Sequence, residues 1–124
     1  MIEPKQEATP LIEREQIDSL IAAAGVDGAG EIMTAFWGST DDLIAALRGA
    51  LASGAADDAR KVAHALKGSA SNVGAQALSQ TALDFENQCR DGALTDEAGD
   101  ALEAVVACYA HTKDAFTAYF ANAA

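Results

Sequence analysis

One histidine in this chain of 124 residues stands among residue types that suggest chemistry. His64 is followed by Lys67 at i+3 and Gly68 at i+4, a spacing that places all three on one side of a helix. Imidazole is a nucleophile, an ammonium group stabilises an anion next to it, and a glycine leaves room beside the ring. Gly68 costs a helix roughly 1 kcal/mol relative to alanine, the residue this chain uses most. The pattern favours a histidine that receives a phosphoryl group.

The helix that must position His64 has an apolar side and a basic side. At 100° per residue, its predicted seam toward the protein interior consists of Ala59, Val62, Leu66, Ser69 and Val73. His64 then points about 180° away from this seam. Four residues within about 60° of His64 are predicted to form a surface for partner docking: Arg60, Lys61, Gly68 and Ser71. The alternative is a solvated helix face that carries an incidental histidine.

Glycines and capping residues divide the rest of the chain into further helices. Helical stretches are predicted over residues 12–24, 28–53, 56–73 and 76–90, with a fifth of about 25 residues that has Thr95 as its N-cap. The second stretch is either one bent helix or two consecutive ones, because Ser39 and Asp42 have capping-box spacing. The short connections predict antiparallel neighbours. The fold class is therefore all-α, an up-down-up-down four-helix bundle with an additional short N-terminal helix.

Composition and charge support this class and exclude several functions. Alanine occupies 30 positions, whereas valine, isoleucine and threonine together occupy 18, which favours helix over sheet. A net charge of −11 argues against nucleic acid and anionic membrane surfaces as partners. The two cysteines, Cys89 and Cys108, are predicted to be buried free thiols. Residues 1–10, which contain both prolines, are predicted to be a flexible arm, and residues 11–124 a single domain of a monomeric cytoplasmic protein.

The segment around His64 resembles a known signature. Residues 63–70, Ala-His-Ala-Leu-Lys-Gly-Ser-Ala, with Val73-Gly74-Ala75, are similar to the AHxLKGSA…GA pattern of histidine-containing phosphotransfer (Hpt) domains. The resemblance covers about residues 12–122 and includes positions farther from the histidine: Phe36, Leu78, Leu83 and Glu86. It implies that His64 is phosphorylated, that Lys67 is a cation near the phosphoryl group and that Gly68 lets the partner approach. Glu86 matches a position that often holds Gln or Glu hydrogen-bonded to the imidazole.

The resemblance implies a phosphorelay phosphocarrier without kinase activity of its own. It would accept a phosphoryl group from a response-regulator receiver aspartate and pass it to another receiver, with receivers and a hybrid histidine kinase as partners. No cofactor of its own is expected, because the Mg²⁺ would be bound by the receiver. The alternative function is a non-catalytic helical adaptor in signalling. A metal or cofactor bundle is the weakest reading, because the sequence lacks the inward Glu-x-x-His pairs of that class.

Three other features have simpler interpretations. His111 lacks cysteines or carboxylates at ligand spacing and is predicted to be a surface histidine. Trp37 follows Phe36 and cannot share its face, so it is expected either to join a docking surface or to pack against the N-terminal helix. The glycines of residues 25–30 lack a preceding strand and a following Lys-Ser/Thr, and so predict a connection between helices.

Overall fold

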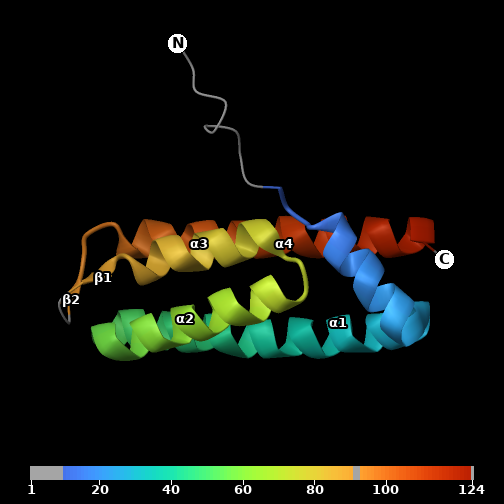
Figure 1. Cartoon of the computed structure of the whole chain (residues 1–124). Helices are drawn as coiled ribbons and strands as arrows, with labels where there is room; N and C mark the ends of the chain where they lie inside the picture. The colour runs from blue at the N-terminus through green and yellow to red at the C-terminus, as the bar shows by residue number, and fades with distance from the viewer. Residues whose placement is uncertain (1–9, 91–92, 124) are drawn as a thin grey trace, which may run out of the picture.

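The fold is a bundle of four helices with one small hairpin, and the computed structural model describes residues 10–90 and 93–123. The elements are α1 (Arg14–Ser53), α2 (Ala56–Asn72), α3 (Gln76–Glu86), β1 (Cys89–Arg90), β2 (Ala93–Leu94) and α4 (Ala98–Ala123). The helices lie side by side and alternate in direction (Figure 1). The predicted all-α, up-down-up-down class is confirmed. The predicted arm, residues 1–10, lies outside the described residues except for Pro10.

Gly25 divides α1 into the predicted short helix and a long one. Its backbone angles, φ 78° and ψ 164°, are not helical and fall in a region that glycine occupies at little cost. The part before Gly25 crosses the end of the bundle (Figure 1). Of the two alternatives for residues 28–53, the structure shows one continuous helix. A stripe of buried residues runs unbroken past Ser39 and Asp42, and its burial outweighs their capping signal. The apolar members of this stripe include Met33, Phe36, Ile44 and Leu47.

A hairpin that the sequence did not predict separates α3 from α4. The prediction of helix over residues 76–90 is wrong at its end, because α3 stops at Glu86 and Cys89 pairs with Leu94 in a two-stranded ladder. The prediction of Thr95 as an N-cap is also wrong, since α4 begins at Ala98. The Thr95 hydroxyl donates to the Gln88 side chain, and the Thr95 N–H donates to the Gln88 carbonyl at 3.0 Å. Thr95 therefore closes the hairpin.

The core contains side chains from all four helices and explains the orientation of α2. The largest fully buried apolar side chains are Ile17, Leu47, Leu66, Leu78, Phe85, Leu102, Val105 and Phe116. On α2 the predicted seam is partly wrong, because Val62 and Ser69 are only half-buried while Ala63 and Ala70 are fully buried. Small alanine side chains on this face allow close packing against neighbouring helices. Cys89 is buried as predicted, whereas Cys108 is only half-buried.

The turn between α2 and α3 is held by the N-terminal part of the chain. Gly74 has φ +83°, and a Cβ there would lie 3.2 Å from the Glu13 carbonyl oxygen. The Glu13 N–H donates to the Gly74 carbonyl at 2.8 Å, and the Gln16 side-chain amide donates to the Ser71 carbonyl at 2.7 Å. Ile17 fills the adjoining core with no exposed surface. The end of α2 is thereby fixed relative to the short N-terminal helix.

Candidate functional site

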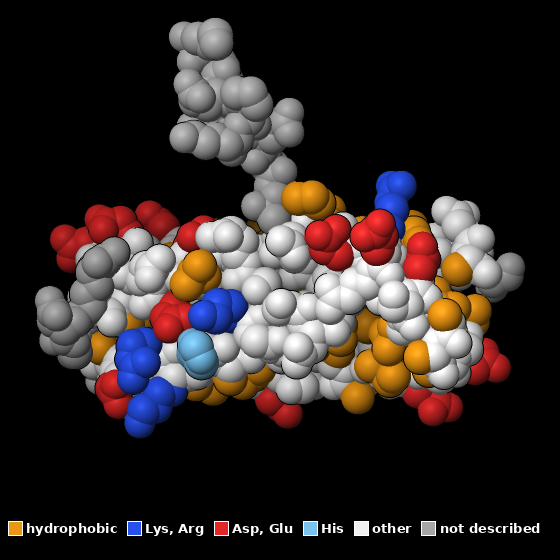
Figure 2. Space-filling view, in the orientation of Figure 1, with side chains coloured by type: hydrophobic (Ala, Val, Ile, Leu, Met, Phe, Trp, Pro, Cys, Tyr) orange, Lys and Arg blue, Asp and Glu red, His pale blue; other side chains and the backbone are white. Residues whose placement is uncertain are grey.

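His64 stands on the outer face of α2 with 64% of its side chain exposed. Figure 2 shows a histidine on the surface over α2, with Lys and Arg side chains and carboxylates gathered around it. The neighbouring α2 residues Ala63 and Leu66 are fully buried, so the helix is anchored while its imidazole reaches solvent. An exposed imidazole on a rigid helix is available to a second protein.

Glu86, the last residue of α3, reaches across to α2 and contacts both His64 and Lys67. Its Oε2 lies 3.4 Å from Nδ1 of His64, and its Oε1 lies 3.7 Å from Nζ of Lys67. The Glu86 side chain is only 18% exposed, and Oε1 is buried without a hydrogen-bond partner among the described residues. The half-buried carboxylate therefore lies between the candidate nucleophile and the candidate cation.

Arg60 and Lys61 begin the basic surface one turn before His64, and both are paired with Asp57. Asp57 accepts from Arg60 at 3.1 Å and lies 3.2 Å from Nζ of Lys61. These two cations hold the pKa of the Asp57 carboxyl below its usual value. The sequence reasoning missed Asp57 as a member of this surface. Its i+3 and i+4 spacing to the two basic residues was the signal for the pairs.

Gly68 and Ser71 continue the exposed face of α2 on the other side of His64. A Cβ on Gly68 would meet nothing within 4 Å, so packing within this chain does not require glycine there. Ser71 is exposed in the last turn of α2, where its carbonyl accepts the Gln16 bond. The structure thus groups His64, Lys67, Gly68 and Glu86 closely, with Ser71 at the edge of the surface.

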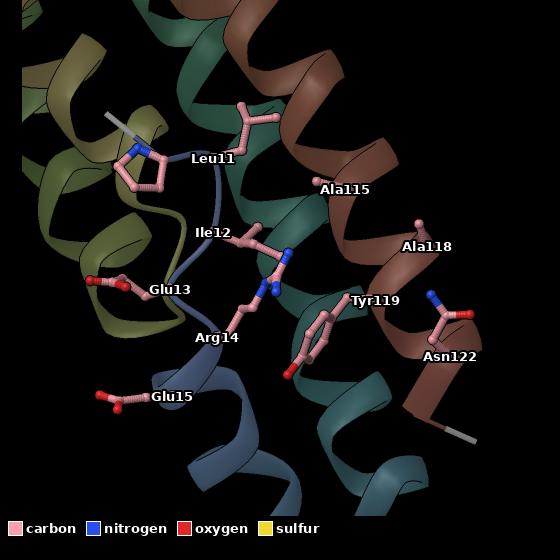
Figure 3. Close-up of a pocket in the computed structure, with 10 residues that line it drawn as sticks. Leu11, Ile12, Glu13, Arg14, Glu15, Ala115, Ala118, Tyr119 and Asn122 are labelled. Carbon is pink, nitrogen blue, oxygen red and sulfur yellow. The ribbon is translucent and has the colours of Figure 1, made fainter. Parts of the chain in front are cut away.

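The more pronounced hollows in the described part of the chain are lined by residues other than His64. A hollow of about 660 Å³ lies where residues 10–15 cross the C-terminal part of α4 (Figure 3). Its walls are mainly apolar and include Leu11, Ile12, Ala115 and Ala118, with Tyr119 between the two segments. An exposed site without a pocket suits a macromolecular partner better than a small-molecule substrate.

The remaining candidates from the sequence lie away from this site. His111 is exposed on α4, and the described residues contain no group of three or more metal-ligating side chains. Trp37 is half-buried and packs against Phe36, Tyr109 and Phe116, with ring centroids 5.1–6.0 Å apart. The predicted packing of Trp37 against the N-terminal helix is wrong, because two of its three aromatic partners are on α4 and none is on that helix.

The comparison with protein families decides the assignment. The family model described as the Hpt domain matches residues 31–115, which include α2, α3 and the His64 site. The chain belongs to the Hpt domain family. The chain is 27% identical over 112 residues to the phosphorelay protein LuxU of Vibrio vulnificus strains YJ016 and CMCP6. These matches cover 90% of this chain and 96% of each relative.

Solved structures agree with this assignment. Histidine-containing phosphotransfer protein B (HptB) from Pseudomonas aeruginosa PAO1 matches with a TM-score of 0.82 and 25% identity, over 91% of this Hpt chain and 96% of that protein. A putative histidine-containing phosphotransfer protein from rice matches with a TM-score of 0.76 and 27% identity, over 86% of this chain and 79% of that protein.

None of the helices in the described part of the chain has the length and apolar character that a membrane span requires.

Proposed function

We propose that His64 is the residue that carries the phosphoryl group of this phosphorelay phosphocarrier. The phosphocarrier role follows from the Hpt family match and from the phosphorelay relatives. The observation that supports His64 is its exposed imidazole, whose Nδ1 faces the Glu86 carboxylate at 3.4 Å. His111, the other histidine, lacks a corresponding ion-pair contact among the described residues.

The geometry favours Nε2 as the attacking atom. A carboxylate beside Nδ1 stabilises the tautomer that carries its proton on Nδ1. The lone pair is then on Nε2, on the opposite edge of the ring. In the proposed step, Nε2 attacks the phosphorus of a receiver's aspartyl phosphate. The N–P bond forms while the P–O bond breaks, and the electron pair leaves with the aspartate.

Lys67 and Gly68 have separate roles in this proposal. The Lys67 ammonium lies one turn from the imidazole and can stabilise the negative charge of the transferred group. Gly68 leaves open space on the same face, through which the receiver's aspartyl phosphate approaches. Arg60, Lys61 and Ser71 extend the surface on which the receiver docks.

The proposed partners are response-regulator receiver domains and a hybrid histidine kinase that contains one. Hpt proteins of phosphorelays interact with such receiver and kinase partners. We expect this chain to require no cofactor of its own and the receiver to bind the Mg²⁺ that assists transfer. The basic residues around His64 favour an acidic docking surface on the receiver, although the whole chain has a net charge of −11.

Phosphoryl transfer to two single-histidine variants tests this function. The full chain and its variants His64→Gln and His111→Gln would each be mixed with phosphorylated receivers of the same organism. We expect the His111→Gln variant to acquire acid-labile, base-stable phosphate at the wild-type rate and the His64→Gln variant to acquire none. Helicity should be unchanged in both, because both side chains are exposed.

The outcomes separate the alternatives. Labelling that survives in the His64→Gln variant and disappears in the His111→Gln variant would move the site to His111. Absence of labelling of the wild type by every receiver would favour the non-catalytic adaptor, which retains the bundle but transfers no phosphate.

A further inference from the structure

The half-buried Glu86 carboxylate is not fully explained by the proposed transfer step. An uncharged side chain of the same shape could also accept a hydrogen bond from Nδ1. Glu86 instead brings a negative charge to within 3.4 Å of Nδ1, on the ring edge opposite the Nε2 that would carry the phosphoryl group. A phosphoryl group on Nε2 would be repelled by this negative charge. A carboxylate at this position must therefore have a favourable effect that an uncharged side chain would not have.

The contacts of the two oxygens hold the carboxylate in place. Oε1 lies 3.7 Å from Lys67 Nζ and has no hydrogen-bond partner among the described residues, and the side chain is 18% exposed. Because little of the carboxylate is exposed to water, its negative charge is stabilised mainly by its contacts with Lys67 and His64. Attraction between Oε1 and Lys67 leaves Oε2 directed at Nδ1.

We propose that Glu86 keeps the proton on Nδ1 of His64 while Nε2 carries the phosphoryl group, and thereby extends onward transfer to more alkaline pH. This inference rests on the proposed phosphorylation of His64. It makes Glu86 a positioning residue for a proton, in addition to its contact with the free imidazole.

The bonding at the ring explains why this proton matters. When Nε2 attacks phosphorus, the ring becomes a cation that still has hydrogen on Nδ1. In onward transfer the N–P bond breaks, its electron pair returns to Nε2, and a neutral imidazole leaves. If Nδ1 had already lost its proton to solvent, the same bond cleavage would release an imidazolate anion, which is a much poorer leaving group. Transfer therefore falls as the phosphorylated ring loses its proton.

The sign of the effect is independent of the repulsion between Glu86 and the phosphoryl group. That repulsion is present whether or not Nδ1 is protonated, so it does not change the proton's affinity for the ring. The carboxylate attracts the protonated ring and has no such attraction for the neutral one. Glu86 must therefore move loss of the proton, and with it loss of transfer, to higher pH.

Other titratable groups around the His64–Glu86 contact lie on α2 and on β1. On α2, Lys67 opposes the effect of Glu86, while Arg60 and Lys61 are paired with Asp57. On β1, burial and the Glu86 charge raise the pKa of the Cys89 thiol, while the Arg60 charge lowers it.

The test compares Glu86→Gln with the control Asp84→Asn. Both changes remove one carboxylate from α3, but Asp84 is exposed and accepts from Gln80, away from the His64 contacts. Onward transfer from each phosphorylated protein to one receiver would be timed from about pH 6 to about pH 10. We expect the alkaline midpoint for Glu86→Gln to lie about one pH unit lower than that of the wild type, and transfer to be about tenfold slower above both midpoints. The Asp84→Asn profile should match the wild type.

Imidazole ¹⁵N spectra of the phosphorylated proteins give a second readout. The Nδ1 signal of phosphorylated His64 should lose its proton at lower pH in Glu86→Gln, while the His111 signal serves as an internal reference. Equal Nδ1 titrations in wild type and Glu86→Gln would overturn the proposal, as would a variant slowed equally at every pH. Failure of the proposed function itself looks different, because the wild-type spectrum would then contain no phosphorylated His64.

Discussion

The Ser79 hydroxyl on α3 donates a hydrogen bond of 3.0 Å to the carbonyl oxygen of Lys67 on α2. This bond joins the two helices at Lys67, which contacts Glu86 through its side chain and lies one turn from His64. Ser79 is half-buried, so the bond is partly shielded from water. It couples the stability of the α2–α3 contact to the geometry of the site.

Replacing Ser79 with alanine should therefore weaken the bundle. We expect the free energy of unfolding to fall by about 0.5–1 kcal/mol, since the lost hydrogen bond outweighs the gain in helix propensity. Urea unfolding followed by circular dichroism measures the change. The same substitution at exposed Ser19 on α1 is the control and should be neutral or slightly stabilising. If the two variants are equally stable, the Ser79 bond contributes nothing.

Replacing Lys67 with alanine should slow phosphoryl transfer in both directions or shorten the phosphohistidine lifetime. The variant removes the cation 3.7 Å from Glu86, and thus the positive charge closest to that carboxylate. We expect a loss of about tenfold in transfer rate, equivalent to about 1.4 kcal/mol of transition-state stabilisation. Lys113→Ala, which removes the same charge from beside the Tyr109 ring on α4, is the matched control. Unchanged rates and lifetime for Lys67→Ala would remove Lys67 from the mechanism.

Substitutions of Gly68 should separate stability from function. A side chain there meets nothing within 4 Å, so alanine should stabilise α2 by up to roughly 1 kcal/mol, and glutamine by nearly as much. Transfer from the receiver should fall as the side chain grows, because the added atoms occupy the path of its aspartyl phosphate. Gly38 on α1 also has open space for a Cβ, and Gly38→Ala should add stability without slowing transfer. Wild-type transfer by Gly68→Gln would show that this clearance is not needed.

Asp57 is expected to make the stability of the folded protein depend on pH. Arg60 and Lys61 lower the pKa of its carboxyl in the folded protein relative to the unfolded chain, where the pKa is near 3.8. Asp57 therefore stabilises the fold above about pH 3.8, and this stabilisation is lost as the pH falls through the lower pKa of the folded state. Asp57→Asn should therefore reduce the thermal midpoint at neutral pH, and the difference should shrink below about pH 4. Thermal melts across this range, repeated at high salt to screen the exposed pairs, measure it. A difference that persists in strong acid would mean that these ion pairs are not its source.

The sequence predicted features that depend on neighbouring residues. The bend at Gly25 and the exposed orientation of His64 follow from backbone preference and from helical periodicity, both of which act over a few residues. The helices themselves follow from composition and spacing for the same reason. The contact of Glu86 with His64 came only through the family resemblance, because α2 and α3 each leave several possible facing pairs.

Features set by distant or competing contacts were missed. The hairpin depends on Thr95 bonding to Gln88, which competes with the role of Thr95 as a helix cap. Tyr109 donates to Asp41 at 2.8 Å across 68 residues, a pairing that no local pattern identifies. The place of Trp37 against α4 depends on the same long-range packing. Local periodicity gives the face of each helix, but the partner of that face requires the assembled bundle.

Contacts between the N-terminal part of the chain and the Gly74 turn bear on how many residues the domain needs in order to fold on its own. The Hpt family match, residues 31–115, excludes both Ile17 and Phe116, which are among the largest fully buried side chains. It also excludes the Glu13 N–H that donates to Gly74. A fragment cut at the family boundaries would contain His64 and its neighbours but would have a cavity at one end and an untethered turn after α2. The smallest autonomous unit therefore extends beyond the family match at both ends.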